Sequence, residues 1–505
     1  MADGPHHPPV QPSGLAGAAP AYRDAVLRPL FAAQKHHNDL YRRIDRAHAV
    51  MLAEQAILPR AEAIALLAGL DTIEATLDLA ARDDAGGFED LFFLREDALR
   101  RVVGGDLAGR LHTGRSRNDM EATIFRLQLK ARMTRLMDLL SSLVGTVLRL
   151  ARQHATTPIL AYTHGQPAQP TTYGHYLAAF AEALLRDLAR LGHAQRDLDA
   201  CPMGAAAITT TGFPISRERV AELLGFASVQ VNSYGCIAAA DQLAAAYSAL
   251  RILFLNIGRL TQDLAFWTSF EVGQARAPDG FVQISSIMPQ KRNPLAIEHL
   301  RSMASLGFGH CGTVLGALHN TPFADMVDAE GPTQSAGLAG FDMADRVLPL
   351  LDALLDGLTI DADRVCANTD ASCATMTELS DSLVRLEGIP FREAHDIGTA
   401  LARRLVGTGR GMAALEGATV AEVFTAVVGR APRLDLSALA ELATPRHSIA
   451  VRDRTGGPGP QAMAQALATL EAMLAQGFAA QAAAAAREQE ATLLVEAAVL
   501  AVTGR

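Results

Sequence analysis

The 505-residue sequence is poor in several features that would mark particular classes of protein. It has only five cysteines and no C-x-x-C spacing, which favours reduced core cysteines in a cytoplasmic protein over a disulfide framework. No apolar run is long enough to span a membrane, since residues 493–502 are short and include Glu496. The formal net charge is −9 and the basic residues are dispersed, which argues against a nucleic-acid surface. We therefore expect neither membrane nor nucleic acid as a partner.

The first part of the chain predicts a tail followed by a small helical domain. Residues 1–20 are rich in Pro, Gly, Ala and His, without a basic start and an apolar segment after it, so they predict a disordered tail rather than a signal peptide. From there to about residue 102 apolar residues recur at helical spacing, with a break near Pro59. Residues 21–119 are the predicted N-terminal helical domain.

The middle of the chain predicts long helices. Residues 120–157 contain no proline, and their apolar residues recur every three or four positions, which predicts one amphipathic helix of about 50 Å. A helix of that length needs long partners, and the same pattern recurs at residues 173–200, 237–270 and 296–318. We predict an all-α fold with a central bundle of long helices at residues 120–373 and a C-terminal helical domain at residues 374–505.

Residues 285–298, with the sequence SSIMPQKRNPLAIE, combine two hydroxyls, a lysine and an asparagine with two prolines. Such a segment suits an exposed loop that closes on an anion. Ser285 or Ser286 could remove a proton next to a carboxylate if N–H dipoles and a cation favour the oxyanion. Lys291 could supply the cation, and Lys291 with Asn293 could hold the doubly charged carboxylate that forms. The alternative is a solvated loop with an ordinary surface lysine.

Two further segments are rich in polar groups. Residues 104–119 are glycine-rich and end in HTGRSRND, where two arginines, a serine and an asparagine would suit a carboxylate. The alternative is a charged loop between domains. Residues 162–172, YTHGQPAQPTT, carry one histidine, which in a loop is usually a satisfied polar group.

Together these segments resemble three signatures of the fumarase/aspartase superfamily, and the closest resemblance is to the argininosuccinate lyase family. The signatures are S-S-x-M-P-x-K-x-N with a later glutamate, H-T-G-R-S-R-N-D, and Y-T-H-x-Q-x-A-Q-P. The resemblance runs from Tyr41 to about Pro458 and implies a three-domain fold of the fumarase/aspartase type. It also implies a homotetramer whose active sites each combine signatures from different subunits, a small-molecule substrate, and no metal or cofactor.

The resemblance implies roles for individual residues. Ser285 matches the first serine of its motif and would be the base, while Glu298 would orient His164 for acid–base chemistry. The implied catalytic set is Ser285, His164, Lys291 and Glu298. The implied substrate-binding set includes Ser116, Arg117 and Asn118 for the succinyl part, with Thr163, Gln169, Ser286, Met288 and Asn293.

The sequence departs from the family pattern at several positions. Ile284 stands where the superfamily often has glycine, Asp45 where the family has a serine, and Ala240 where it has an arginine. An ungapped alignment places Asp325, Glu330 and Thr333 where argininosuccinate lyases have a tyrosine, a glutamine and a lysine for the arginine half of the substrate. We therefore add Asp325 and Glu330 to the predicted substrate-binding set, because carboxylates there suit an amine-bearing leaving group.

The predicted function is that of a carbon–nitrogen lyase. It would eliminate an amine from an N-substituted aspartate, either argininosuccinate or a related aminodicarboxylic acid, and release fumarate. The alternative substrate is an aminopolycarboxylate of the ethylenediamine disuccinate type. A catalytically silent structural relative or a cycloisomerase is a weaker alternative, since a silent scaffold need not keep Ser285, Lys291, Asn293, His164 and Glu298.

Overall fold

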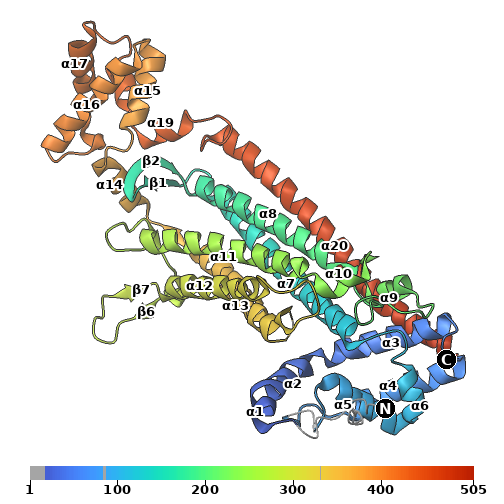
Figure 1. The fold of residues 1–505 in the computed structure, drawn as a ribbon. Coiled ribbons are helices and arrows are strands. Elements are labelled where there is room, and N and C mark those ends of the chain that lie inside the picture. Colours follow the sequence, from blue (N-terminus) through green and yellow to red (C-terminus); the bar gives the residue numbers. More distant parts are fainter. Residues whose placement is uncertain (1–17, 84–86, 330, 505) are drawn as a thin grey trace, which may run out of the picture.

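The computed structural model of the protein describes residues 18–83, 87–329 and 331–504. Most of the predicted tail, and Glu330, lie outside the described residues. The fold is mostly helical and elongated, with small helical units at both ends of a bundle (Figure 1). The long helices are α7 (Arg117–Gln153), α8 (Tyr173–Leu198), α11 (Asp241–Trp267), α12 (Leu295–Leu318), α13 (Gly331–Gly357) and α20 (Pro460–Thr503). The prediction of an all-α fold around a bundle of long helices is confirmed.

Helix α7 shows why this sequence forms so long a helix. Its 37 residues begin at a capping box in which the Ser116 side chain accepts from the backbone and Asp119 reaches back to the Ser116 N–H. No proline interrupts it, and from Leu129 onward its apolar residues are buried in the main core cluster with those of α8, α11, α12 and α13. The bundle therefore rests on the apolar periodicity that the sequence displays.

The N-terminal unit has its own core cluster. Its helices are α1 (Pro20–Tyr22), α2 (Arg28–Gln34), α3 (Asn38–Glu54), α4 (Arg60–Thr76), α5 (Leu91–Val103) and α6 (Gly105–Arg110). The end of α20 completes this cluster with buried Ala498, Val499 and Val502. The Arg60 guanidinium also donates to the carbonyls of Val502 and Ala501, both at 2.8 Å. The last long helix thus spans the bundle and docks on the first helices of the chain.

The C-terminal unit holds a third core cluster. Its helices are α14 (Ala362–Ala371), α15 (Met376–Glu387), α16 (Phe391–Gly407), α17 (Gly417–Val428), α18 (Leu436–Glu441) and α19 (Pro445–Ala450). The predicted domain boundaries at residues 119 and 373 stay predictions, and α20 packs on the bundle and on the N-terminal unit.

Short strands and helices join the long helices. The strand pairs are β1 (Pro158–Thr163) with β2 (Gln166–Thr172), β3 (Ala200–Cys201) with β4 (Ser228–Val229), β5 (Ala275–Arg276) with β8 (Thr359–Ile360), and β6 (Gln283–Ile284) with β7 (Arg292–Asn293). The short helices α9 (Arg217–Leu224) and α10 (Ser233–Ala238) lie between α8 and α11. Two of the strand pairs, β1–β2 and β6–β7, carry predicted site residues.

Two expectations about single features need correction. Helix α11 is long and apolar enough to cross a membrane, contrary to the expectation from the sequence, but it packs against α8 and α12 in the bundle and half of its most apolar window is buried. The cysteines were all expected in the core. Cys201, Cys236 and Cys311 are buried, whereas Cys373 is half-buried and Cys366 is exposed.

Candidate functional site

The first signature forms the loop that begins α7. Asp119 is fully buried, and its carboxylate accepts the backbone N–H of Ser116 at 2.8 Å, of Gly204 at 2.9 Å and of Ala206 at 3.0 Å. Burial raises the pKa of Asp119 to about 6, although these three N–H groups favour the anion. The carboxylate of Asp119 thus joins the signature loop to the chain around residues 204–206.

Asn118 and Arg117 extend from this loop toward other elements. The Asn118 amide donates to a carboxylate oxygen of Asp325 at 2.7 Å and to the carbonyl of Ala207 at 3.1 Å. The Arg117 guanidinium donates to Asp90 at 2.6 Å and lies over the ring of Phe93, 4.9 Å from its centroid. The structure therefore brings Asp325, predicted to bind the leaving group, into contact with a predicted succinyl-binding residue.

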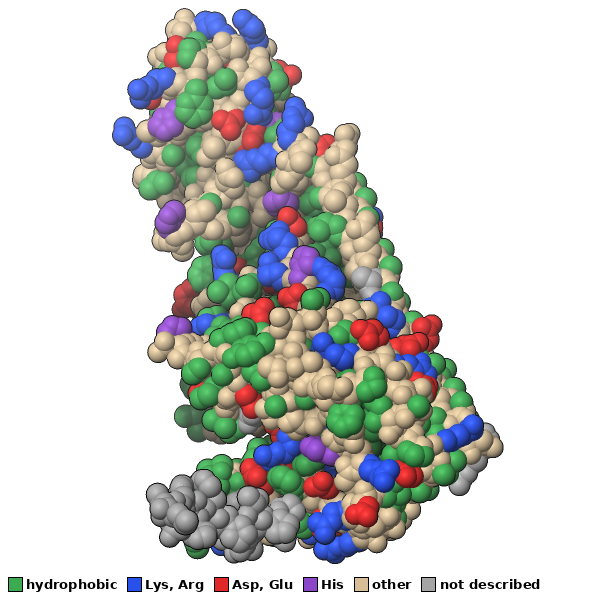
Figure 2. All heavy atoms as spheres, turned by 45° about the vertical axis from the view of Figure 1, so that its right-hand side comes forward, with side chains coloured by type: hydrophobic (Ala, Val, Ile, Leu, Met, Phe, Trp, Pro, Cys, Tyr) green, Lys and Arg blue, Asp and Glu red, His purple; other side chains and the backbone are tan. Residues whose placement is uncertain are grey.

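The side chains of Asp90, Arg117, Asn118 and Asp325 line a cavity of about 680 Å³ between the N-terminal helices and the bundle. Figure 2 shows the surface hollowed in this region, with charged side chains of both signs around it. The carboxylates in the lining are Glu89, Asp90, Glu121, Asp325 and Asp342. The guanidinium groups in the lining are those of Arg117 and Arg132, and they pair with Asp90 and Asp342, both at 2.6 Å. Partial burial raises the pKa of Asp325, opposed by the charge of Arg117.

The second signature forms the β1–β2 hairpin. His164 and Gly165 make its two-residue turn, with φ angles of 55° and 73°. A turn with two positive φ angles matches the twist of an antiparallel pair. Thr163, His164 and Gln169 are exposed at this tip. The hairpin thus presents the three predicted side chains to the outside of the chain.

The third signature forms the loop between β6 and β7. The Ser285 hydroxyl accepts the backbone N–H of Met288 at 3.1 Å and of Ile287 at 3.4 Å. Ser286, Met288 and Lys291 are exposed, and Asn293 is half-buried. Glu298 is exposed in the first turn of α12. Two N–H dipoles therefore point at the oxygen predicted to become the base.

One chain does not bring the three signatures together. The start of α7, the β1–β2 hairpin and the β6–β7 loop lie at separate places along the bundle (Figure 1). Within the described ranges, no side-chain hydrogen bond or ion pair involves His164, Lys291 or Glu298, so the implied contact between His164 and Glu298 is not present in a single chain.

The departures from the family pattern lie in different surroundings. Ala240 is the N-cap residue of α11 and Thr333 is half-buried in α13, whereas Ile284 is 76% exposed at the edge of the loop. Asp45 is buried. Sequence reasoning missed the part played by Asp119, although its place three residues after Ser116 is the spacing of a capping box.

Comparisons with known proteins bear on the family of this chain. Residues 89–309 match the profile of a lyase family, and residues 373–450 match the argininosuccinate lyase C-terminal region. Argininosuccinate lyase 2 of Agrobacterium fabrum is 49% identical over 463 residues, which cover 90% of each chain. The chain belongs to the argininosuccinate lyase family. Another argininosuccinate lyase, that of Methanoculleus marisnigri, is 37% identical over 86% of this chain and 87% of its own.

Solved structures place this argininosuccinate lyase family member among lyases of the same fold. EDDS lyase in complex with formate has a TM-score of 0.84 and 27% identity over 96% of both chains. The predicted superfamily, fold and enzyme class are confirmed: the protein is a carbon–nitrogen lyase that releases fumarate.

Proposed function

We propose that Ser285 removes a Cβ proton from an N-substituted aspartate. The C–H electron pair moves into the neighbouring carboxylate, and Lys291 and Asn293 stabilise the resulting dianion. The C–N bond then breaks, its electrons stay on nitrogen, and His164 with Glu298 supplies the proton that the leaving amine needs. The support for Ser285 is the pair of backbone N–H groups directed at its hydroxyl, since they favour the oxyanion.

We propose that the complete site forms in a homotetramer from signatures of different subunits. The three signatures lie at separate places on one chain, and large apolar side chains remain exposed on the bundle, namely Ile252 and Leu255 of α11 and Leu306 of α12. A cytoplasmic location stays a prediction.

Mixing inactive variants tests the shared site. His164→Asn and Ser285→Ala tetramers should each be inactive and should regain activity after they are dissociated and reassembled together, because some sites then combine two unmutated segments. Light scattering gives the mass of the parent protein. A fully active monomer, or no recovery in mixed tetramers, would show that the site lies within one chain.

We propose that the leaving group is a cationic amine, and that it occupies the cavity beside Asn118. The observation that carries this proposal is the 2.7 Å contact between Asn118 and Asp325, since it sets a carboxylate next to a residue implied to bind the succinyl part. Thr333 cannot supply the charge of the lysine that the family has for the carboxylate of the arginine moiety.

A substrate panel tests the leaving group. Fumarate release is measured by its ultraviolet absorbance for argininosuccinate, for ethylenediamine disuccinate and for N-alkyl aspartates without a second amine. We expect kcat/KM for argininosuccinate to be lower than for at least one substrate whose leaving group carries an extra amine. If argininosuccinate is the best substrate of the panel, the acidic lining does not set specificity.

A further inference from the structure

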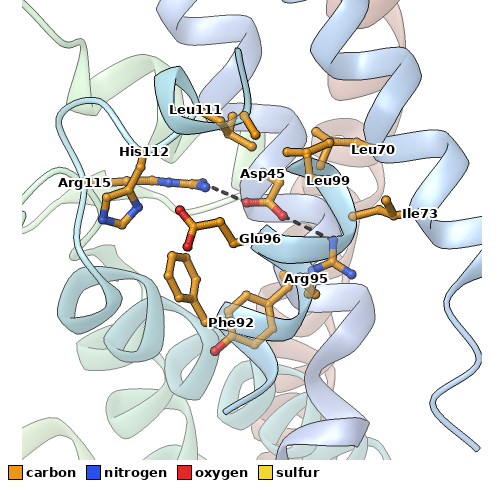
Figure 3. Close-up of a pocket in the computed structure, with 12 residues that line it drawn as sticks. Asp45, Leu70, Ile73, Phe92, Arg95, Glu96, Leu99, Leu111, His112 and Arg115 are labelled. Carbon is orange, nitrogen blue, oxygen red and sulfur yellow. Dashed lines mark hydrogen bonds and ion pairs between the residues drawn. The ribbon is translucent and has the colours of Figure 1, made fainter. Parts of the chain in front are cut away.

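Asp45 lies at the centre of a buried charge network between α3, α5 and the loop before α7. Its side chain is only 8% exposed, and one carboxylate oxygen accepts from Arg115 at 2.8 Å while the other accepts from Arg95 at 3.2 Å. Figure 3 shows the carboxylate between the two guanidinium groups. A single acidic side chain of α3 thus joins a helix of the N-terminal unit to the first signature.

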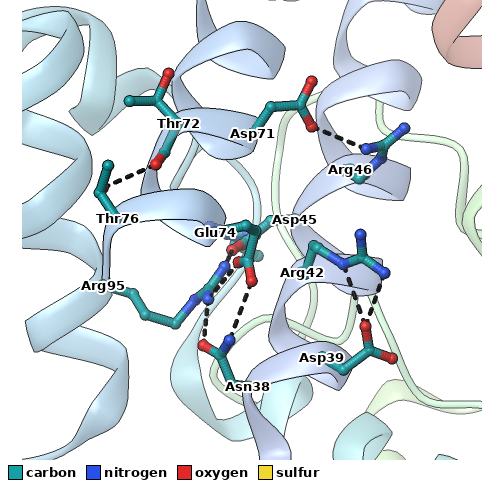
Figure 4. Close-up of polar contacts among 11 residues, drawn as sticks. Asn38, Asp39, Arg42, Asp45, Arg46, Asp71, Thr72, Glu74, Thr76 and Arg95 are labelled. Carbon is teal, nitrogen blue, oxygen red and sulfur yellow. Dashed lines mark hydrogen bonds and ion pairs between the residues drawn. The ribbon is translucent and has the colours of Figure 1, made fainter. Parts of the chain in front are cut away.

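The two arginines depend on Asp45 to different degrees. Arg95 also donates to Glu74 at 2.6 Å, and the Asn38 amide bonds to Glu74 at 3.0 Å (Figure 4). Among the residues that the structure describes, Asp45 is the only carboxylate that forms an ion pair with Arg115. Both guanidinium groups are 4% exposed, so each needs a counter-charge inside the protein. Loss of Asp45 would remove the ion pair of the buried Arg115 guanidinium.

The cavity beside this network is too small for substrate. It measures about 20 Å³ and is lined by Asp45, Arg95, Glu96, His112 and Arg115. A space of that size takes about one water molecule. Among the described residues, the Nε groups of both arginines and Nδ1 of His112 have no hydrogen-bond partner, so a water there could bond to them. Asp45 therefore acts on the reaction only through a neighbour.

Arg115 is that neighbour, because it directly precedes Ser116, Arg117 and Asn118 in the chain. A second contact from α3 holds the same loop, in which His48 Nε2 donates to the carbonyl of Thr113 at 2.9 Å. We propose that Asp45 is a positioning residue, which fixes the succinyl-binding loop through its ion pair with Arg115. The inference rests on the proposed function, and it explains why this chain has a carboxylate where the family pattern has a serine.

Variants of both partners test the inference. Arg115→Gln leaves Asp45 paired with Arg95, whereas Asp45→Asn removes the ion pair that holds Arg115. We expect each to raise KM by about tenfold or more, with a smaller change in kcat, because loop placement affects binding of the succinyl part before chemistry. The double variant should have the KM of Arg115→Gln alone, since both changes remove one interaction.

Glu74→Gln is the matched control. It removes the other carboxylate from Arg95 and should lower the melting temperature, yet it leaves the Arg115 ion pair intact and should keep the parental KM. If Asp45→Asn does not fold, Arg115→Gln alone decides. A parental KM in Arg115→Gln, or an equal rise of KM in Glu74→Gln, overturns the positioning role. An inactive parent protein on every N-substituted aspartate would instead refute the proposed function.

Discussion

Replacing Ser285 by alanine tests the proposed base most directly. The Ser285 hydroxyl is half-buried and receives two backbone N–H groups, at 3.1 and 3.4 Å from Met288 and Ile287. Ser286 is exposed, and its side chain has no hydrogen bond in the part of the chain that the structure describes. Only the first of the two adjacent hydroxyls therefore has surroundings that favour an oxyanion.

Loss of a positioned base typically costs roughly 10²–10⁴-fold in turnover. At about 1.36 kcal/mol for each factor of ten, this is about 3–5 kcal/mol of activation free energy. Ser285→Ala should therefore lower kcat by that factor, whereas Ser286→Ala should stay within about tenfold of the parent. Folding should hardly change, because the freed N–H groups lie in an exposed loop where water replaces the hydroxyl, at a cost of about 1 kcal/mol or less.

The assay is fumarate release under saturating substrate, with kcat and KM determined separately. Thermal unfolding and light scattering of both variants establish that fold and assembly are retained. The reasoning is refuted if Ser285→Ala keeps near-parental turnover while Ser286→Ala loses it. In that case the N–H groups at Ser285 serve the shape of the loop and not the chemistry.

Two further predictions concern specificity and acid stability. Asp325→Asn should lower kcat/KM about ten- to a hundredfold for substrates with a cationic leaving group, as expected for the loss of a charge-assisted bond. The kcat/KM of substrates with a neutral leaving group should stay unchanged. An equal loss for both kinds of substrate would contradict the assignment of Asp325. Burial lowers the pKa of His37 from 6.5 to about 4. Below its ordinary pKa this histidine binds fewer protons in the folded than in the unfolded state, so its contribution to stability should fall as the pH drops from about 6.5 toward 4, by about 2 kcal/mol at pH 5. His37→Gln should flatten that slope in urea unfolding measured between pH 7 and pH 5, and an unchanged slope would exclude His37 as its source.

The fold could be predicted where local pattern decides it. The pattern of residues 120–157 predicted α7 to within a few residues at each end, because apolar spacing and the absence of proline are local properties. The β1–β2 hairpin was missed, although Gly165 in the sequence TyrThrHisGly marks a turn. The course of α20 could not be predicted, since its alanine-rich sequence has a weak apolar stripe and its partners on α3 and α4 lie more than 400 residues away.

The site residues divide in the same way, into those that the local sequence identifies and those whose contacts depend on tertiary packing. The three polar segments stand out by their residue types, and their resemblance to a family identifies them as signatures. The structure brings Asn118 and Asp325, both predicted to bind substrate, into contact. The ion pair of Asp45 with Arg115 could not be predicted, because it joins residues 70 positions apart and depends on tertiary packing. The relation of His164 to Glu298 stays a prediction, because the described residues of one chain do not bring the two side chains into contact.

The course of α20 has a consequence for how the chain folds as it leaves the ribosome. N-terminal units usually fold first during synthesis. Here the core of the first unit includes Ala498, Val499 and Val502 of α20, so α3 and α4 emerge more than 400 residues before the three side chains that complete their core. The nascent protein must keep this apolar surface out of aggregates until α20 has been made. We expect docking of α20 to be a late folding step, and the growing chain to be a good client for chaperones that bind exposed apolar helices.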